Sequence, residues 1–425
     1  MSVLLANSAH AIQGFDVNDV AILLPVTADS SDVSVGLRLD SRNAAGEALL
    51  PKSIFDQIIP QVAFHQPFPI GSAANYADYR IVAVRIDPCA PDPAAPVKEC
   101  RQALRLTAQP FHSAVSSATV TEGAFHIVYF LGTGALNLDS PLVADLQKIR
   151  DVSGSVTAGL VLGAHPGLAK EPAAGAVRGF VEKWATAARL SVVTFIVRAP
   201  ELNWWRFYRG QVHGGNWTVD PIPGARGSLD QLTTSLFEGF LSGAVRDAVP
   251  NLFLDSDHWG FDGPVPAAAI PVFHELMNPL KSNMANRDCV SCHTAAIGIR
   301  QFRIPFSGAP IEFVNPVGIT GFAELATDQG GLAPCADGAE NCVFPSPFLL
   351  GYSKLGVGRA ELSISALAAN AAAASANKLN TMLGLANPSP RDCSDRKIRE
   401  CFLGRLDGAS PTAANCLAFC PPAKP

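Results

Sequence analysis

The chain has 425 residues, of which 48% are apolar and 16% are charged, and its net charge is -5. The apolar content suffices for packed cores, and a mildly acidic chain without a basic patch gives no electrostatic basis for binding nucleic acid. No run approaches the roughly 20 consecutive apolar residues of a membrane span, so we expect no transmembrane segment. At about 150 residues per domain, the length predicts two or three domains.

The N-terminal residues 1–11 (MSVLLANSAHA) have two interpretations. A short apolar stretch is followed by Ala9-His10-Ala11, which fits the small-x-small cleavage pattern of an export signal. A basic segment ahead of it is missing, and the apolar stretch is short. Residues 1–11 are therefore either the remnant of an export signal or an ordinary chain start.

Residues 12–260 are predicted to form an α+β domain in which strands come first and helices then alternate with strands. Short segments rich in β-branched residues and bounded by Gly, Pro, Asn or Asp predict the strands, and apolar residues at helical spacing predict the helices. The expected strands are 19–28, 33–39, 80–87, 101–107, 124–131, 156–162, 190–197 and 203–212; the expected helices are 141–150, 174–189 and 228–246.

Residues 261–425 differ in character and are predicted to form a second, helical and loop-rich module. Helices are expected over 271–281 and 286–300, before a stretch rich in Pro and Gly. An Ala-rich helix is expected over 359–383, where Gly384 would end it.

Eight of the ten cysteines are expected to form disulfides. Cys89 and Cys100 close one short loop rich in Pro and Ala, and Cys335 and Cys342 close another. Four more lie in the C-terminal tail, where three pairings are open: Cys393, Cys401, Cys416 and Cys420. Disulfides of this kind persist in oxidising compartments, so we expect a periplasmic or extracellular protein.

The remaining two cysteines belong to a C-x-x-C-H motif, Cys289-Val290-Ser291-Cys292-His293, the pattern for covalent attachment of a c-type haem. On a helix, positions i, i+3 and i+4 share one face, so Cys289, Cys292 and His293 would point together. A zinc site is an alternative, but it needs two further ligands. A redox dithiol is another, but it favours a βα context that does not precede this motif.

The stretch around this motif, RDCVSCHTA, resembles the haem-attachment sequence of c-type cytochromes. The resemblance covers about ten residues and leaves the rest of the chain unassigned. It implies one haem c held covalently by Cys289 and Cys292, with His293 as the iron ligand.

The second axial ligand would decide whether the haem transfers electrons or binds substrate. No histidine follows His293, and the candidates are His258, His274, Met277, Met284 and Met382, or none of these. The leading interpretation is electron transfer with redox partner proteins, as a component of an envelope assembly rather than as an enzyme. The alternatives are a haem-dependent oxidase or peroxidase and a non-redox structural or adhesion protein of the envelope.

Overall fold

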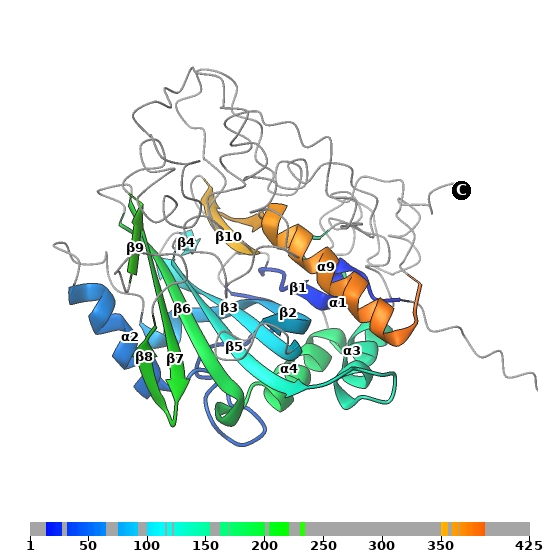
Figure 1. The fold of residues 1–425 in the computed structure, drawn as a ribbon. Coiled ribbons are helices and arrows are strands. Elements are labelled where there is room, and N and C mark those ends of the chain that lie inside the picture. The colour runs from blue at the N-terminus through cyan, green and yellow to red at the C-terminus, as the bar shows by residue number, and fades with distance from the viewer. Residues whose placement is uncertain are drawn as a thin grey trace, which may run out of the picture.

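The computed structural model describes residues 14–27, 32–64, 75–91, 100–114, 117–120, 123–153, 162–169, 171–199, 204–220, 230–233, 350–355, 359–364 and 366–386. These residues form an antiparallel sheet with a small number of helices, an α+β arrangement (Figure 1). None of the described helices is long and apolar enough to cross a membrane.

The main sheet has nine strands in the order β1-β2-β3-β5-β6-β7-β8, with β4 added to β3 and β9 added to β7. Its strands are β1 (Ala21–Leu23), β2 (Tyr79–Pro91), β3 (Cys100–Ala114), β4 (Ser117–Val120), β5 (Gly123–Thr133), β6 (Leu190–Ala199), β7 (Trp204–His213), β8 (Asn216–Val219) and β9 (Asp230–Thr233). A separate hairpin consists of β10 (Leu350–Leu355) and β11 (Arg359–Ile364). The five strands expected over 80–87, 101–107, 124–131, 190–197 and 203–212 correspond to β2, β3, β5, β6 and β7. Their starts agree within a residue, but β2 extends four residues and β3 seven residues beyond the expected end.

The helices are α1 (Val17–Val20), α2 (Lys52–Phe64), α3 (Pro141–Val152), α4 (Ala173–Trp184) and α9 (Ala366–Leu383). Short 3-10 turns cover Tyr76–Asp78, Pro166–Ala169 and Ala187–Arg189. The helix expected over 141–150 matches α3, which begins with a proline at its first turn. The helix expected over 174–189 corresponds to α4, which ends five residues earlier, at Trp184. Figure 1 shows α9 beside α1 along the β1–β2 side of the sheet.

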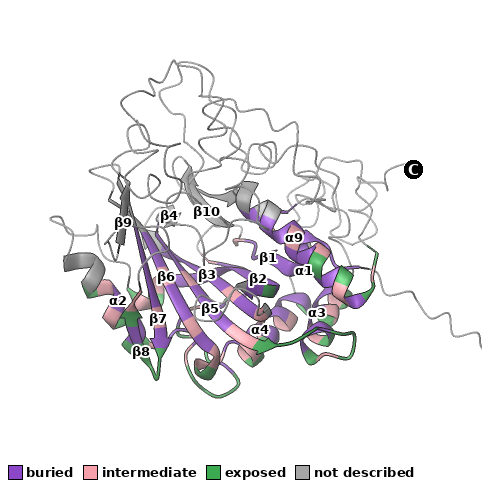
Figure 2. Ribbon diagram, in the orientation of Figure 1, coloured by how far each residue is buried: buried purple, intermediate pink, exposed green. Residues whose placement is uncertain are grey.

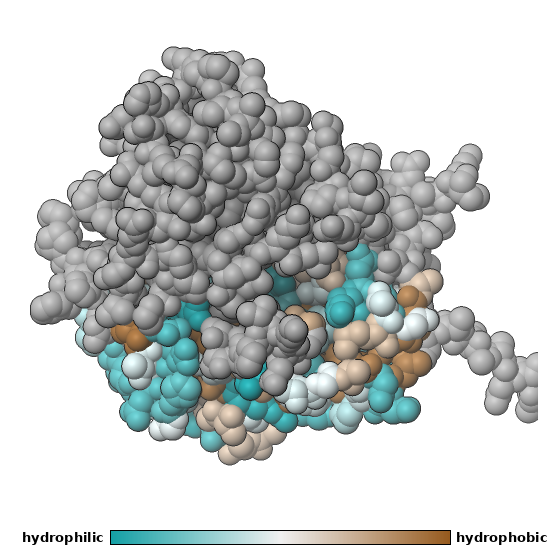
Figure 3. Space-filling model, viewed as in Figure 1, coloured by the Kyte–Doolittle hydropathy of each residue, from teal (hydrophilic) through white to brown (hydrophobic). Residues whose placement is uncertain are grey.

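The main hydrophobic core lies between the sheet and its helices, and Ala90, Ala103, Val128 and Val192 form a smaller separate cluster. Figure 2 shows the buried residues along the strands and helices. Phe55 of α2 packs on Phe125 of β5 with ring centroids 5.6 Å apart, and Phe125 packs on Phe195 of β6 at 4.4 Å. Such tilted aromatic pairs add to the free energy gained from burying apolar surface. The surface is largely hydrophilic where Figure 3 shows described residues, and Leu138 is the large hydrophobic residue exposed among them.

Helix α9 belongs to this same core, although its residues fall in the predicted module 261–425. Its small side chains Ala372, Ala373 and Ala376 are completely buried, as is Leu379. Asn380 of α9 accepts a hydrogen bond from the backbone N–H of Phe15 and donates one to its carbonyl, both at 2.8 Å. Residues from both sides of the expected boundary near 260 therefore share one core, while the boundary itself stays a prediction.

Three expected elements differ in the structure. Residues 19–28 begin as helix rather than strand, because Asp16 and Asp19 form a reciprocal capping box that starts α1. Residues 33–39 form no strand; they make isolated bridges around a turn at Gly36, whose φ is +71°. The helix expected over 228–246 is wrong at 230–233, which pair with β7 as strand β9.

The Ala-rich helix also starts later than expected. Residues 359–364 pair with β10 in a complete antiparallel register, so the helix begins at Ala366. It ends at Leu383, and Gly384 adopts a φ of +66°, as the sequence predicts. The helices expected over 271–281 and 286–300 lie outside the described residues, as does the strand expected over 156–162 except for Leu162.

Candidate functional site

The predicted haem-attachment residues Cys289, Cys292 and His293 lie outside the described residues. The same holds for four of the candidate second ligands: His258, His274, Met277 and Met284. Met382 is described: it lies on α9, partly buried, and packs against the hydrophobic core. That is the environment of an ordinary core methionine.

Cys89 and Cys100 lie on the neighbouring strands β2 and β3. Cys89 is disulfide-bonded, and the strand register places Cys100 opposite Pro91, two residues from Cys89. The Cys89–Cys100 pairing itself stays a prediction. The other predicted disulfide cysteines lie outside the described residues.

A cluster of charged residues lies on the side of the sheet that α9 borders. Arg85 of β2 and Arg105 of β3 are direct cross-strand partners, so their side chains project from the same face. Asp87 lies between them: its Oδ1 accepts from Arg85 Nε at 2.9 Å and Nη2 at 2.6 Å, and its Oδ2 is 2.5 Å from Arg105 Nε. We call Arg85 and Arg105, together with the Asp87 that they share, the buried arginine pair.

Helix α9 contributes one further residue, Ser375, to this cluster. The hydroxyl of Ser375 donates a hydrogen bond to Asp87 Oδ1 at 2.8 Å. The Asp87 side chain is only 6% exposed, whereas each arginine side chain keeps 22% of its surface accessible. The carboxylate is thus enclosed, and the arginine side chains are largely but not completely buried.

Electrostatics in this cluster favour ionised Asp87. Burial alone would raise the pKa of Asp87, but the guanidinium groups of Arg105 and Arg85 and the Ser375 hydrogen bond hold it below its usual range. Burial lowers the pKa of Arg105; the charge of Arg85 lowers it further, and Asp87 acts against both effects. The two arginines therefore repel each other across one shared carboxylate.

A row of polar side chains crosses the same face one step further along the strands. The register joins Thr107 of β3, His126 of β5, Thr194 of β6 and Arg209 of β7 as successive cross-strand partners. His126 Nδ1 lies 3.4 Å from Thr107 Oγ1, and Arg209 forms an ion pair at 3.2 Å with Asp220. A sheet face of this kind is polar rather than a simple packing surface.

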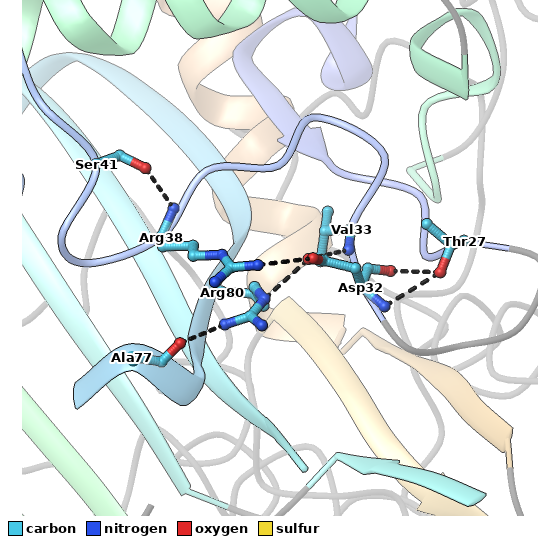
Figure 4. A network of polar contacts seen from close by, with 7 residues as sticks. All are labelled: Thr27, Asp32, Val33, Arg38, Ser41, Ala77 and Arg80. Atoms are coloured by element: carbon cyan, nitrogen blue, oxygen red, sulfur yellow. Dashed lines mark hydrogen bonds and ion pairs between the residues drawn. The ribbon is translucent and has the colours of Figure 1, made fainter. Parts of the chain in front are cut away.

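A second group of two arginines and one aspartate lies near the edge of the sheet, and we call it the exposed arginine pair (Figure 4). Asp32 accepts from Arg80 Nε at 2.9 Å and from Arg38 Nη2 at 3.3 Å. The side chains of Asp32 and Arg38 are 30% and 41% exposed, whereas that of Arg80 is only 11% exposed. Water therefore reaches Asp32 and Arg38, unlike Asp87.

No group of three or more metal-ligating side chains occurs within the described ranges. The sequence reasoning did not single out the buried arginine pair. A signal was present, since Arg85 and Asp87 alternate on one face of a strand with Ile86 between them, but nothing local indicates that Arg105 pairs opposite Arg85.

No protein-family model, no curated protein and no solved structure matches this chain. Its function is therefore argued from its own residues.

Proposed function

We propose that this protein is an exported monohaem c-type cytochrome-like protein that transfers electrons. The observation that carries the proposal is the sequence Cys289-Val290-Ser291-Cys292-His293. Its spacing suits two thiols and one imidazole on a single helical face, and it resembles the attachment site of c-type cytochromes.

Three residues would hold the group. Cys289 and Cys292 would each form a thioether bond through Sγ to the porphyrin edge, and His293 would supply an axial imidazole nitrogen. A haem so bound supplies reversible one-electron exchange between ferric and ferrous iron. A covalent link keeps the haem attached without the deep burial that a free haem needs.

The compartment is argued from the cysteines. A disulfide at Cys89 is typical of an oxidising environment, and haem attachment outside the cytoplasm would agree with it. A periplasmic or extracellular location fits both, with redox partner proteins and an envelope assembly as the setting.

A haem-dependent oxidase or peroxidase is the second candidate. No histidine follows His293, and Met382, the methionine downstream of the motif, packs against the core. An iron left without a strong second ligand would have an open position for peroxide or another small ligand.

The test is a pyridine haemochrome assay on the full chain after acid-acetone extraction, which removes haem that is not covalently bound. We expect covalent haem in the natural chain and none in Cys289→Ala with Cys292→Ala. The matched control is Cys335→Ala with Cys342→Ala, which also loses two cysteines but should keep its haem. Covalent haem surviving in the motif variant, or absent from the natural protein, would refute the proposal.

The optical spectrum separates the two haem functions. A low-spin ferric spectrum that does not change when cyanide is added supports electron transfer. A high-spin spectrum that shifts on adding cyanide supports the oxidase or peroxidase instead.

Mass spectrometry of non-reduced peptides tests the compartment. We expect a peptide that links Cys89 to Cys100. Eight free thiols outside the haem motif would overturn the argument for export.

A further inference from the structure

The buried arginine pair has an unbalanced charge. Arg85 and Arg105 lie directly opposite each other on the neighbouring strands β2 and β3, an arrangement in which like charges repel. In the described part of the chain, Asp87 is the one carboxylate that contacts either of them. Within the part of the chain that the structure describes, one positive charge therefore remains without a compensating negative charge.

The exposed arginine pair shows why this matters. It also has two arginines that share one aspartate, but there the aspartate, Asp32, is 30% exposed and one of the arginines, Arg38, is 41% exposed, while Arg80 is 11% exposed. Water and counterions screen an excess charge there. Around Asp87, which is 6% exposed, little water is available for that purpose, so the excess charge costs more.

Hydrogen-bond donors are also left over at the buried arginine pair. A guanidinium group has five N–H bonds, and Arg85 directs only Nε and Nη2 toward Asp87. Arg105 approaches Asp87 through Nε, which makes no hydrogen bond there, and within the described part of the chain its Nη groups have no hydrogen-bond partner either. The fork of a guanidinium group matches the paired oxygens of a carboxylate or phosphate.

We propose that Arg85 and Arg105 form a binding site for an oxyanion, a carboxylate or phosphate group that neutralises the excess charge. Asp87, held by Ser375, is the positioning residue that fixes the two forks side by side. The oxyanion comes either from a free small anion or from a propionate of the attached haem, and the second source rests on the function proposed above.

The first experiment measures the thermal unfolding midpoint of the full chain with rising inorganic phosphate, at ionic strength held constant with chloride. A tenfold excess over Kd should raise the midpoint by roughly 1 to 3 °C. Arg105→Gln should abolish the rise, while Arg38→Gln, the matched change in the exposed arginine pair, should keep it. An equal rise in all three chains would mean an adventitious ion only and would overturn the proposal.

A second measurement needs no variant and covers the case in which Arg105→Gln does not fold. Phenylglyoxal modifies accessible guanidinium groups, and peptide mapping reports each site separately. Phosphate should slow the modification of Arg105 at least tenfold relative to that of Arg38. Equal rates with and without phosphate would overturn the proposal.

The two sources are separated by haem content. If the ligand is a free anion, phosphate shifts the midpoint of both the haem-loaded chain and the Cys289→Ala, Cys292→Ala chain. If the ligand is a haem propionate, phosphate acts only on the haem-free chain. If the natural chain itself carries no covalent haem but still gives the phosphate shift, the cytochrome proposal is refuted and the oxyanion site is kept. A shift in neither form refutes the site.

Discussion

Replacing Asp87 with asparagine removes one charge from the core and leaves the shape of the side chain nearly unchanged. The amide oxygen still accepts from Ser375, so the lost quantity is the attraction to Arg85 and Arg105. Removing one partner of a buried ion pair costs about 3 to 5 kcal/mol. Because each arginine keeps 22% exposure, we expect the lower end, about 3 kcal/mol.

Urea unfolding at pH 7 measures this loss as a lower midpoint with an unchanged slope. The matched control is Asp32→Asn in the exposed arginine pair, for which we expect less than about 1 kcal/mol. A loss below about 1 kcal/mol for Asp87→Asn, or equal losses for the two variants, would refute the reasoning about burial.

The pH dependence has a definite sign. The pKa of Asp87 is lowered in the folded state, so its ionised form stabilises the fold above the unfolded pKa of about 3.9. This stabilisation is lost as the pH falls from there through the folded-state pKa. The stability difference between the natural chain and Asp87→Asn should therefore be constant above about pH 5 and shrink below pH 4. A difference as large at pH 2 as at pH 7 would show that charge is not its cause.

Two further predictions concern the core. Asn380→Ala should lower the free energy of unfolding by about 2 to 4 kcal/mol, because it leaves the buried N–H and carbonyl of Phe15 without their hydrogen-bond partner. Urea unfolding measures this loss, and a loss under about 1 kcal/mol would contradict the prediction. Gly210→Ala should cost about 1 to 3 kcal/mol, because a Cβ there would collide with the Trp217 ring. Gly179→Ala in α4, with open space around its Cβ position, should instead stabilise by about 0.5 to 1 kcal/mol, and the same unfolding curves should show the opposite sign.

The parts of the fold that the sequence could predict are those encoded locally. Alternation and β-branched residues indicated β2 and β6, and Pro141 with helical spacing indicated α3. The capping box of Asp16 and Asp19 was also local, but the apolar run after it is equally typical of a strand.

Other features depend on contacts between distant residues and leave no local pattern. An Ala-rich helix fits many surfaces, so nothing within 366–383 indicates that α9 packs beside α1. The buried arginine pair needs the β2–β3 register, which a strand pattern does not fix. The haem motif is the opposite case: its spacing is entirely local, and Cys289, Cys292 and His293 remain predictions outside the described residues.

The hydrogen bonds between Phe15 and Asn380 have a consequence for how the chain folds. They join residues 365 positions apart, so this core cannot close until almost the whole polypeptide is available. A nascent chain that stops before residue 366 would present α1 and the β1–β2 side of the sheet without their apolar cover. Folding of this core therefore waits until α9 has been synthesised.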